Sequence, residues 1–222
     1  MKTFEKLSKV DGNVQAREVY REATIAHCCK IARETLSELD LGEAGGVTRL
    51  CLFQPHLHKK GIMFSAFIFS IVISEMLGIE YMWSSDPDTI ILPDTLQGTI
   101  ETISGDPLVG GGSAGLILHN ENETITTKLG GMIYWSEVYI SRSTALASGI
   151  SDCQSGPSTA FRVSALLAIL YPWYTQTVMG HRMIVNEDRH LTTNLIMRGW
   201  TITFASDTLA ETDTPTTLSR WL

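Results

Sequence analysis

Apolar residues recur along this chain with helical spacing in some stretches and as short continuous runs in others. Between residues 14 and 40 they stand three or four positions apart, which is typical of one buried face of a helix. The residues of this stripe are Ile25, Cys28, Cys29, Ala32, Leu36 and Leu39. Gly42 follows the stripe and predicts the end of the helix near residue 40.

The remaining apolar runs predict that strands and helices alternate. Strands are expected at residues 47–53, 79–84, 109–118 and 200–205, and helices at 62–79, 93–103, 125–148, 158–170 and 187–198. The run at 62–79 is the most apolar, but serines and Glu75 interrupt it, so we interpret it as a buried core helix rather than a membrane span. The alternation predicts an α/β fold with a mixed, mostly parallel sheet flanked by helices, in a single domain without an internal linker.

Charge and cysteine content exclude several classes of protein. The chain has 222 residues, enough for one substantial domain, and a formal net charge of −7. Without a dense cluster of lysine and arginine, this charge argues against nucleic acid as a partner. The four cysteines show no metal-binding spacing, so we expect a reduced, cytosolic setting. The charged N-terminus predicts no signal peptide.

Two carboxylates, Asp86 and Asp88, come directly after the predicted strand at 79–84. In an extended segment, side chains two positions apart point to the same side, and Pro87 restricts the backbone between them. Two converging carboxylates suit Mg²⁺ or Mn²⁺ shared with a phosphate-bearing substrate. The alternative is a simple turn, because Asp-Pro-Asp-Thr is a favourable turn sequence.

A basic segment precedes the apolar helix at residue 62. It contains Lys59 and Lys60, and a helix start adds free backbone N–H groups that favour an anion. A solvated loop is the alternative. The glycine run at 110–112 lacks the lysine of a P-loop and indicates close approach of the backbone to a neighbouring group.

Acidic residues also begin the predicted helix near residue 187. Asn186 is a good helix cap, and Glu187 and Asp188 would complement the helix dipole in the first turn. Helix capping is therefore one interpretation of these acids, and a functional site is the other.

Taken in order, these segments resemble the cytoplasmic catalytic region of processive family-2 glycosyltransferases, most closely the hyaluronan synthases, over about residues 54–222. Each segment alone is common, whereas all of them in one order point to one family. The stretches that carry the resemblance are His58-Lys59-Lys60-Gly61, Ser85-Asp86-Pro87-Asp88-Thr89, Asp106-Pro107-Leu108-Val109-Gly110-Gly111, Cys153-Gln154-Ser155-Gly156-Pro157 and Glu187-Asp188-Arg189-His190-Leu191-Thr192. The resemblance implies a nucleotide-diphospho-sugar transferase fold of the GT-A type.

The resemblance also implies that the segments act together to move a sugar from a UDP-sugar donor to a glycan acceptor. Lys59 and Lys60 would contact the nucleotide diphosphate. Asp86 and Asp88 would hold the nucleotide and a bridging Mg²⁺ or Mn²⁺, which stabilises negative charge on the leaving UDP. Asp188 would be the general base of a single displacement that inverts the anomeric carbon. The other substrate-binding residues that the resemblance implies are Cys153, Gly156, Pro157, Glu187 and Arg189.

The chain departs from the family pattern in several places. It starts downstream of the strands that grip the uridine, and it lacks the family's transmembrane helices. Thr217 stands where the family motif Gln-x-x-Arg-Trp has glutamine. We therefore expect a fragment of a synthase that lies at the cytoplasmic face of the plasma membrane, anchored by segments absent from this chain. Gly115 lies where hyaluronan synthases carry a nearby acid, so the transferred sugar is left unassigned.

Two other functions remain open at this point. The absent uridine-binding strands and the missing glutamine favour a truncated or degenerate relative, which would act at most as an assembly partner. A metal-dependent phosphohydrolase that uses Asp86 and Asp88 would instead release phosphate from simple esters.

Overall fold

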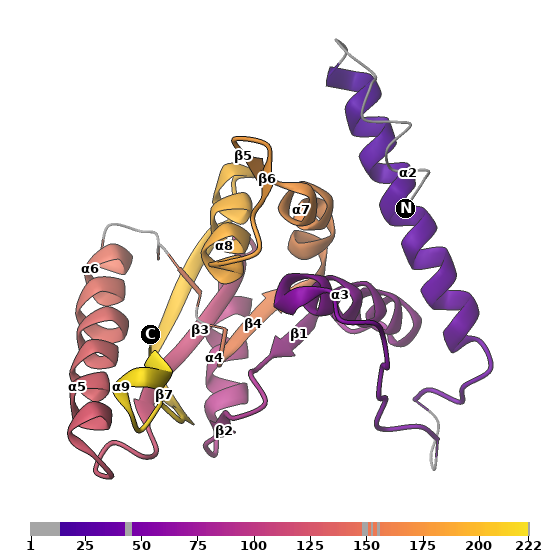
Figure 1. Cartoon of the computed structure of the whole chain (residues 1–222). Coiled ribbons are helices and arrows are strands. Elements are labelled where there is room, and N and C mark those ends of the chain that lie inside the picture. Colours follow the sequence, from indigo (N-terminus) through magenta and orange to yellow (C-terminus); the bar gives the residue numbers. More distant parts are fainter. Residues whose placement is uncertain (1–13, 43–45, 148–150, 152, 155, 222) are drawn as a thin grey trace.

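The structure is a computed structural model that describes residues 14–42, 46–147, 151, 153–154 and 156–221. Within these residues, five strands form one mixed sheet flanked by helices (Figure 1). In spatial order the strands are β1 (Tyr81–Ser84), β4 (Thr159–Arg162), β3 (Val109–Leu118), β7 (Thr201–Thr212) and β2 (Ile90–Ile91). This mixed α/β architecture fits the GT-A-like fold expected from the sequence.

The sheet is mixed, but its neighbouring strands are not mostly parallel. β3 pairs with β7 in parallel, while β1–β4, β3–β4 and β2–β7 are antiparallel pairs. Because β4 runs against both of its neighbours, β1, β3 and β7 share one direction, and β4 and β2 run the other way. The expectation of a mostly parallel sheet is therefore right in that three of the five strands run the same way, but wrong in that three of the four strand pairs are antiparallel. An apolar pattern along the chain does not reveal which strands become neighbours.

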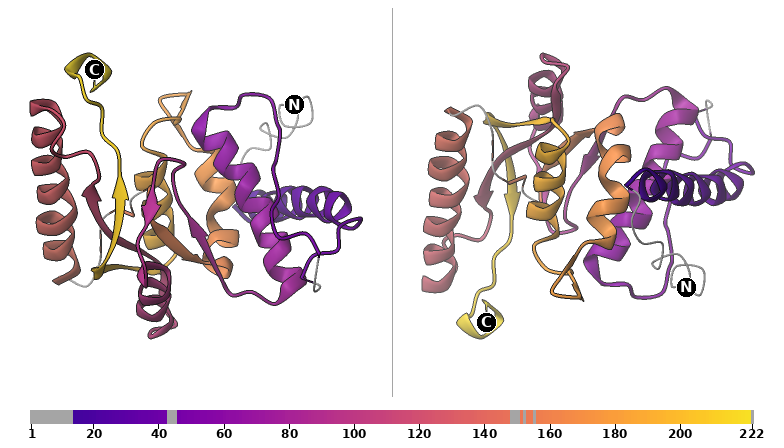
Figure 2. Two further views of the ribbon diagram at one scale, coloured as in Figure 1. Left: turned by 90° about the horizontal axis from the view of Figure 1, so that it is seen from below. Right: turned by 90° about the horizontal axis from the view of Figure 1, so that it is seen from above.

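The helices lie on two sides of the central strands β3 and β7. Figure 2 shows a column of helices on one side and a larger group on the other. The column is α5 (Ile125–Tyr134), the π-helix η1 (Trp135–Ser141) and α6 (Arg142–Ala147); the group is α2 (Val14–Leu36), α3 (His58–Leu77), α7 (Val163–Thr175) and α8 (Glu187–Met197). The smaller elements are α4 (Thr95–Ser104), α9 (Leu218–Trp221) and the hairpin of β5 (Thr177–Val178) and β6 (His181–Arg182).

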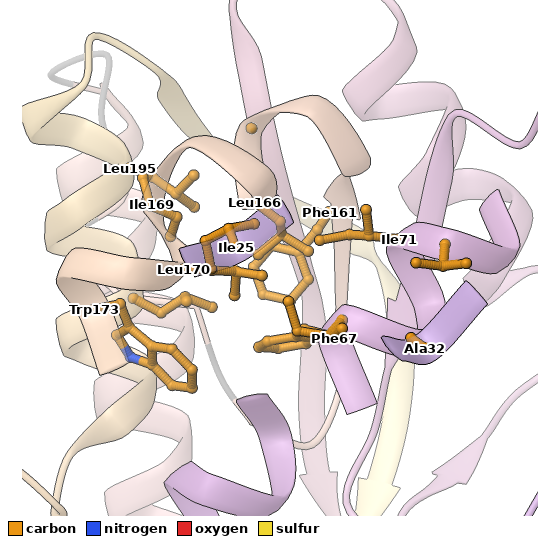
Figure 3. Close-up of a cluster of buried hydrophobic side chains, with 14 of the residues drawn as sticks. Ile25, Ala32, Phe67, Ile71, Phe161, Leu166, Ile169, Leu170, Trp173 and Leu195 are labelled. Carbon is orange, nitrogen blue, oxygen red and sulfur yellow. The ribbon is translucent and has the colours of Figure 1, made fainter. Parts of the chain in front are cut away.

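The main hydrophobic core lies among α2, α3, α7, α8 and β4. Figure 3 shows its large side chains turned toward one another. Phe67 of α3 meets Phe161 of β4 edge to face, with ring centroids 5.8 Å apart. Helix α2 contributes Ile25, Ala32 and Leu36, which confirms the predicted stripe. Burial of each large apolar side chain contributes roughly 1.5–3 kcal/mol, and this core holds α3, β4 and α8 in fixed relation.

Helix α3 has the composition of both a core helix and a membrane helix. By length and composition it is the one helix among the described residues that would cross a membrane, with a mean hydropathy of 1.7. Of its most apolar stretch, 39% is buried inside the protein, and Phe67 and Ile71 lie in the main core. Core helices of soluble proteins can have the same length and composition, so burial is the property that distinguishes the two. The packing agrees with the predicted core helix.

Three predicted boundaries are wrong. Residues 47–53 form no strand; Val47 makes only an isolated bridge to Leu41, and Phe53 is almost fully exposed, so these residues have no strand to pair with. Thr159–Arg162, predicted as helix, is β4, because it pairs with β1 and with β3. Helix α3 begins at His58, so the predicted basic loop is the first turn of the helix.

Candidate functional site

Three segments that are far apart in the sequence meet at Lys59. Its Nζ lies 3.1 Å from Asp86 Oδ1 and 3.1 Å from Glu187 Oε1. Lys59 lies in the first turn of α3, Asp86 follows β1, and Glu187 begins α8. Partial burial lowers the pKa of Lys59, but the hydrogen bonds and charges of Glu187 and Asp86 together raise it by more, so the net pKa is raised. A protonated amine therefore holds the starts of two helices and the end of a strand together.

The segment after β1, which carries both carboxylates, is a turn. The N–H of Thr89 donates to the carbonyl of Asp86 at 3.1 Å, so the turn interpretation is confirmed and a continued strand is not. Pro87 favours this turn because its ring fixes the backbone angle required there. Burial first, and then the charges of Asp88 and Asp86, raise the pKa of Tyr134. Both carboxylates thus act electrostatically on one tyrosine of α5.

The first turn of α8 is anchored by contacts other than the expected cap. Asn186 adopts a left-handed conformation with φ 56° and makes no side-chain capping hydrogen bond. Instead, Trp173 Nε1 of α7 donates to the carbonyl of Glu187 at 2.8 Å. Asp188 Oδ1 accepts a 2.7 Å hydrogen bond from the backbone N–H of Arg189. Arg189 is exposed to solvent. The prediction of Asn186 as a side-chain cap is therefore wrong, whereas Glu187 and Asp188 do lie in the first turn as predicted, and Glu187 also pairs with Lys59.

A hydroxyl group joins the turn before β4 to α8. The backbone N–H of Gln154 donates to Thr192 Oγ1 at 3.0 Å, and Thr192 Oγ1 donates to the carbonyl of Asp188 at 3.0 Å. Thr192 is fully buried, so water does not compete for either hydrogen bond. This link sets the position of Asp188 relative to the turn.

The turn before β4 approaches the lysine closely because residue 156 is glycine. A Cβ at Gly156 would lie 3.2 Å from Asp86 Oδ2 and 3.3 Å from Lys59 Nζ. Any side chain there would crowd the ion pair. Cys153 is buried, and its Sγ makes a weak hydrogen bond to the carbonyl of Gln154, so its thiol supports the turn from within.

An open pocket of about 250 Å³ lies over this turn. Asp188, Gly156 and Pro157 line one wall. The opposite wall comes from the helical column and β3, and its residues are Leu116, Ile133, Tyr134, Glu137, Val138 and Arg142. The residues from the column were not predicted from the sequence. Glu137 and Arg142, two of the three charged residues in the segment 125–148, were the one signal for them.

Lys60 is placed differently from Lys59. It is 2% exposed, its Nζ donates to the carbonyl of Met183 at 2.7 Å, and it lies over the ring of Trp173. Burial lowers the pKa of Lys60. The structure therefore brings Lys59, Asp86 and Glu187 together and directs Lys60 into the interior. Its expected contact with a diphosphate has no support in this geometry.

The carboxylates fit a divalent ion only if a substrate supplies further ligands. Among the described residues, no group of three His, Cys, Asp or Glu side chains is arranged to hold a metal ion. Mg²⁺ is usually bound by one or two carboxylates together with substrate phosphates. Asp86 and Asp88 would be the two carboxylates of such a site, and Asp88 is exposed to solvent.

Comparison with known proteins gives the same family as the sequence motifs. The chain is 28% identical to human hyaluronan synthase 2 over 175 residues, which is 78% of this chain and 30% of that protein. It is 27% identical to hyaluronan synthase 3 of Xenopus laevis over 231 residues, covering 96% of this chain and 40% of the relative. No protein-family model matches. The predicted resemblance to hyaluronan synthases is confirmed, and the chain spans well under half the length of these relatives.

Proposed function

We propose that this chain, which is similar to hyaluronan synthases, is a catalytic region of an inverting glycosyltransferase that moves a sugar from a UDP-sugar to a glycan acceptor. One observation carries the proposal. Lys59, Asp86 and Glu187 form a charged cluster beside Gly156, and the pocket over Gly156 also contains Asp188. A lysine that could bind an anion thus lies beside Gly156, and a candidate base lines the pocket over the same residue, as expected for transfer from a nucleotide diphosphate.

The donor end of the site is the charged cluster. The ammonium of Lys59 is exposed enough to reach a phosphate, since half of its side chain is open to solvent. Its two carboxylate partners keep it protonated and fix its position. Asp86 and Asp88 would hold Mg²⁺ or Mn²⁺, and the bound ion would stabilise the negative charge of the leaving diphosphate.

The acceptor end is the pocket wall at Asp188. This carboxylate would take the proton of the acceptor hydroxyl as the oxygen attacks the anomeric carbon. Thr192 Oγ1 donates to the backbone carbonyl of Asp188, and the N–H of Arg189 donates to its carboxylate, so α8 itself positions this group. Gly156 and Pro157 would form the floor under the sugar, Cys153 would support that floor, and Arg189 would meet the substrate from the exposed side. One base without a covalent nucleophile gives inversion.

In the intact protein we place this region at the cytoplasmic face of a membrane, attached by segments outside the present chain. The similarity to hyaluronan synthases supports this placement. Two functions compete with transfer: a non-catalytic relative that serves as an assembly partner, and a phosphohydrolase that uses Asp86 and Asp88. Titration with UDP, together with an assay of phosphate release, separates the three.

The test is calorimetric titration of the chain with UDP, with and without Mn²⁺. We expect binding that requires Mn²⁺ and that Asp88→Ala abolishes, while Asp207→Ala, which removes an exposed carboxylate of β7, leaves it unchanged. UDP affinity that ignores the metal would count against the proposal. Steady phosphate release from simple esters would favour the hydrolase, and a chain that binds no UDP would favour the non-catalytic relative.

A further inference from the structure

Lys60 is a buried lysine that the proposed transfer does not use. It is 2% exposed, and its Nζ donates to the carbonyl of Met183 at 2.7 Å. Burial lowers the pKa of Lys60, the charge of Glu187 opposes this change, and the charge of Arg182 lowers the pKa further. Burying an ammonium group costs free energy that an apolar side chain of similar length would avoid. Packing alone therefore does not account for a lysine at this position.

The amine of Lys60 contacts two groups that lead to the first turn of α8. Met183, whose carbonyl accepts the hydrogen bond, lies shortly before Glu187 in the chain. The Nζ also lies 5.3 Å from the ring centroid of Trp173, and the face of an indole ring attracts a cation. Trp173 Nε1 in turn donates to the carbonyl of Glu187 at 2.8 Å. Lys60 is thus connected to the backbone of Glu187 in two ways, along the chain from Met183 and through the indole of Trp173.

The groups around Lys60 are themselves held firmly. Trp173 is fully buried and packs against Phe67 of α3, with ring centroids 5.8 Å apart (Figure 3). The indole ring therefore cannot move without disturbing the main core. Asn186, directly before Glu187, has a left-handed backbone with φ 56°, which asparagine adopts more readily than most residues. The chain therefore enters α8 from a defined direction.

The position of Glu187 matters for the site because its side chain meets Lys59. Glu187 Oε1 lies 3.1 Å from Lys59 Nζ, and only 12% of the Glu187 side chain is open to solvent. Lys59 and Lys60 are neighbours in the first turn of α3, but Lys59 pairs with the carboxylate of Glu187 and Lys60 is connected to its backbone. The two lysines therefore hold the first turn of α8 together.

We propose that Lys60 is a positioning residue for nucleotide binding, because it fixes the backbone of Glu187, and Glu187 in turn sets the place of the Lys59 ammonium. This inference rests on the proposed function. Lys60 itself makes no contact with the nucleotide, since its Nζ is enclosed by Met183 and Trp173. Without Lys60 the first turn of α8 shifts, and Lys59 presents its charge in several orientations rather than one. Nucleotide affinity then falls because the site is less preorganised.

The test is calorimetric titration with UDP in Mn²⁺, together with the NMR cross-peak of the Trp173 indole N–H. Lys60→Met keeps an unbranched side chain, and we expect it to shift the cross-peak and to weaken UDP binding about tenfold. Lys60→Arg keeps a donor and a cation, so UDP affinity should stay within about threefold of the unaltered chain. Lys30→Met, which removes an exposed lysine of α2, is the matched control and should change neither measurement.

Trp173→Phe distinguishes positioning from direct contact with the nucleotide. It keeps an aromatic ring but removes the donor to the carbonyl of Glu187, so we expect a three- to tenfold loss of UDP affinity, in keeping with roughly 1 kcal/mol. A residue that only stabilises the fold would lower the free energy of unfolding and leave the affinity of the folded chain unchanged. Circular dichroism at the titration temperature confirms that each variant is folded.

Each outcome supports or overturns the inference. Unchanged UDP affinity in folded Lys60→Met would overturn it and leave Lys60 with a structural role only. A loss in Lys60→Met with full affinity in Trp173→Phe would also overturn it, by showing that Lys60 contacts the nucleotide directly. If Lys60→Met does not fold, Trp173→Phe decides, since a loss of affinity supports the inference and full affinity overturns it. Absence of UDP binding by the unaltered chain would overturn the proposed function, and this inference with it.

Discussion

Lys59 Nζ lies 3.1 Å from Glu187 Oε1, and this contact joins the first turn of α3 to the first turn of α8. The carboxylate is the less exposed partner, with 12% of the Glu187 side chain open to solvent against 50% for Lys59. Loss of the cation would therefore leave a mostly buried negative charge beside a second one on Asp86. The lysine serves the fold as well as the site.

Lys59→Met is expected to lower UDP affinity at least tenfold and the free energy of unfolding by about 1 kcal/mol, a value reduced for solvent screening. The raised pKa of Lys59 determines how this contribution to the free energy of unfolding depends on pH. The stabilising charge is fully present below the usual lysine value of 10.5 and is lost only as the pH rises through the higher folded value. Urea unfolding at pH 7 and pH 9 should show the same deficit at both. Lys30→Met, in an exposed pair with Glu34, is the control.

Gly156→Ala should impair nucleotide binding without unfolding the chain. The added Cβ would lie 3.2 Å from Asp86 Oδ2, so the ion pair with Lys59 must shift by a few tenths of an ångström. We expect a three- to tenfold loss of UDP affinity, in keeping with roughly 1 kcal/mol. Gly105→Ala is the control, because its Cβ would make ordinary contacts of 3.7 Å. Unchanged UDP affinity in Gly156→Ala would contradict the close approach of the turn.

Thr192→Val should detach the turn before β4 from α8 while keeping the shape of the side chain. It removes the acceptor for the N–H of Gln154 and the donor to the carbonyl of Asp188. We expect a loss of about 1–3 kcal/mol in the free energy of unfolding, since a buried N–H is left unpaired. Thr192→Ser, which keeps the hydroxyl, should retain most of this free energy of unfolding. A loss in Thr192→Ser as large as in Thr192→Val, measured by urea unfolding, would contradict the role of the hydroxyl.

Arg162→Lys should destabilise the sheet. Arg162 is buried, and its guanidinium donates to the carbonyls of Val109 at 3.1 Å and Asp106 at 3.3 Å while pairing with Glu80. A lysine lacks the planar set of donors that serves all three. We expect a loss of about 2–3 kcal/mol by urea unfolding. Arg33→Lys, in an exposed pair, should stay within about 0.5 kcal/mol of the unaltered chain.

His119 provides a pH-dependent contact away from the site. Its Nδ1 lies 2.7 Å from Glu211 Oε2, and this hydrogen bond and charge raise the pKa of His119. A raised histidine pKa adds stability that is full below the usual value of 6.5 and is lost as the pH rises through the folded value. NMR titration should show the imidazole pKa falling in Glu211→Gln. In Glu123→Gln, which removes a minor contributor, the change should be much smaller.

The sequence predicts an element well where periodicity decides its structure. The stripe of Ile25, Ala32 and Leu36 needs only a helix and an apolar neighbour, and the protein supplies both. Thr159–Arg162 was misassigned because its structure depends on two partner strands that are remote in sequence. The run at 47–53 has strand-forming residues but no partner strand among the described residues. A local sequence pattern does not reveal which distant strands will pair.

In the site, too, local motifs identify some residues, whereas others are placed by tertiary packing alone. Lys59, Asp86 and Glu187 stand in recognisable motifs, and the structure brings them into contact. Their predicted roles in binding and catalysis, like those of Asp188 and Asp88, stay predictions. Tyr134 and Arg142 belong to no motif, and their place in the pocket follows from how the helical column packs across β3. Lys60 stands in a recognisable motif that predicts a phosphate contact, but its side chain is buried in the structure and donates to the carbonyl of Met183.

The π-helix η1 sets the angular position of one pocket wall. Tyr134, Val138 and Arg142 all line the pocket, and η1 lies between the first and the last of them, with turns of i→i+5 hydrogen bonds. Deleting one residue from η1 would rotate Arg142 by about 100°. The pocket wall therefore depends on a single residue count, and length variation there would change its lining more than substitution would.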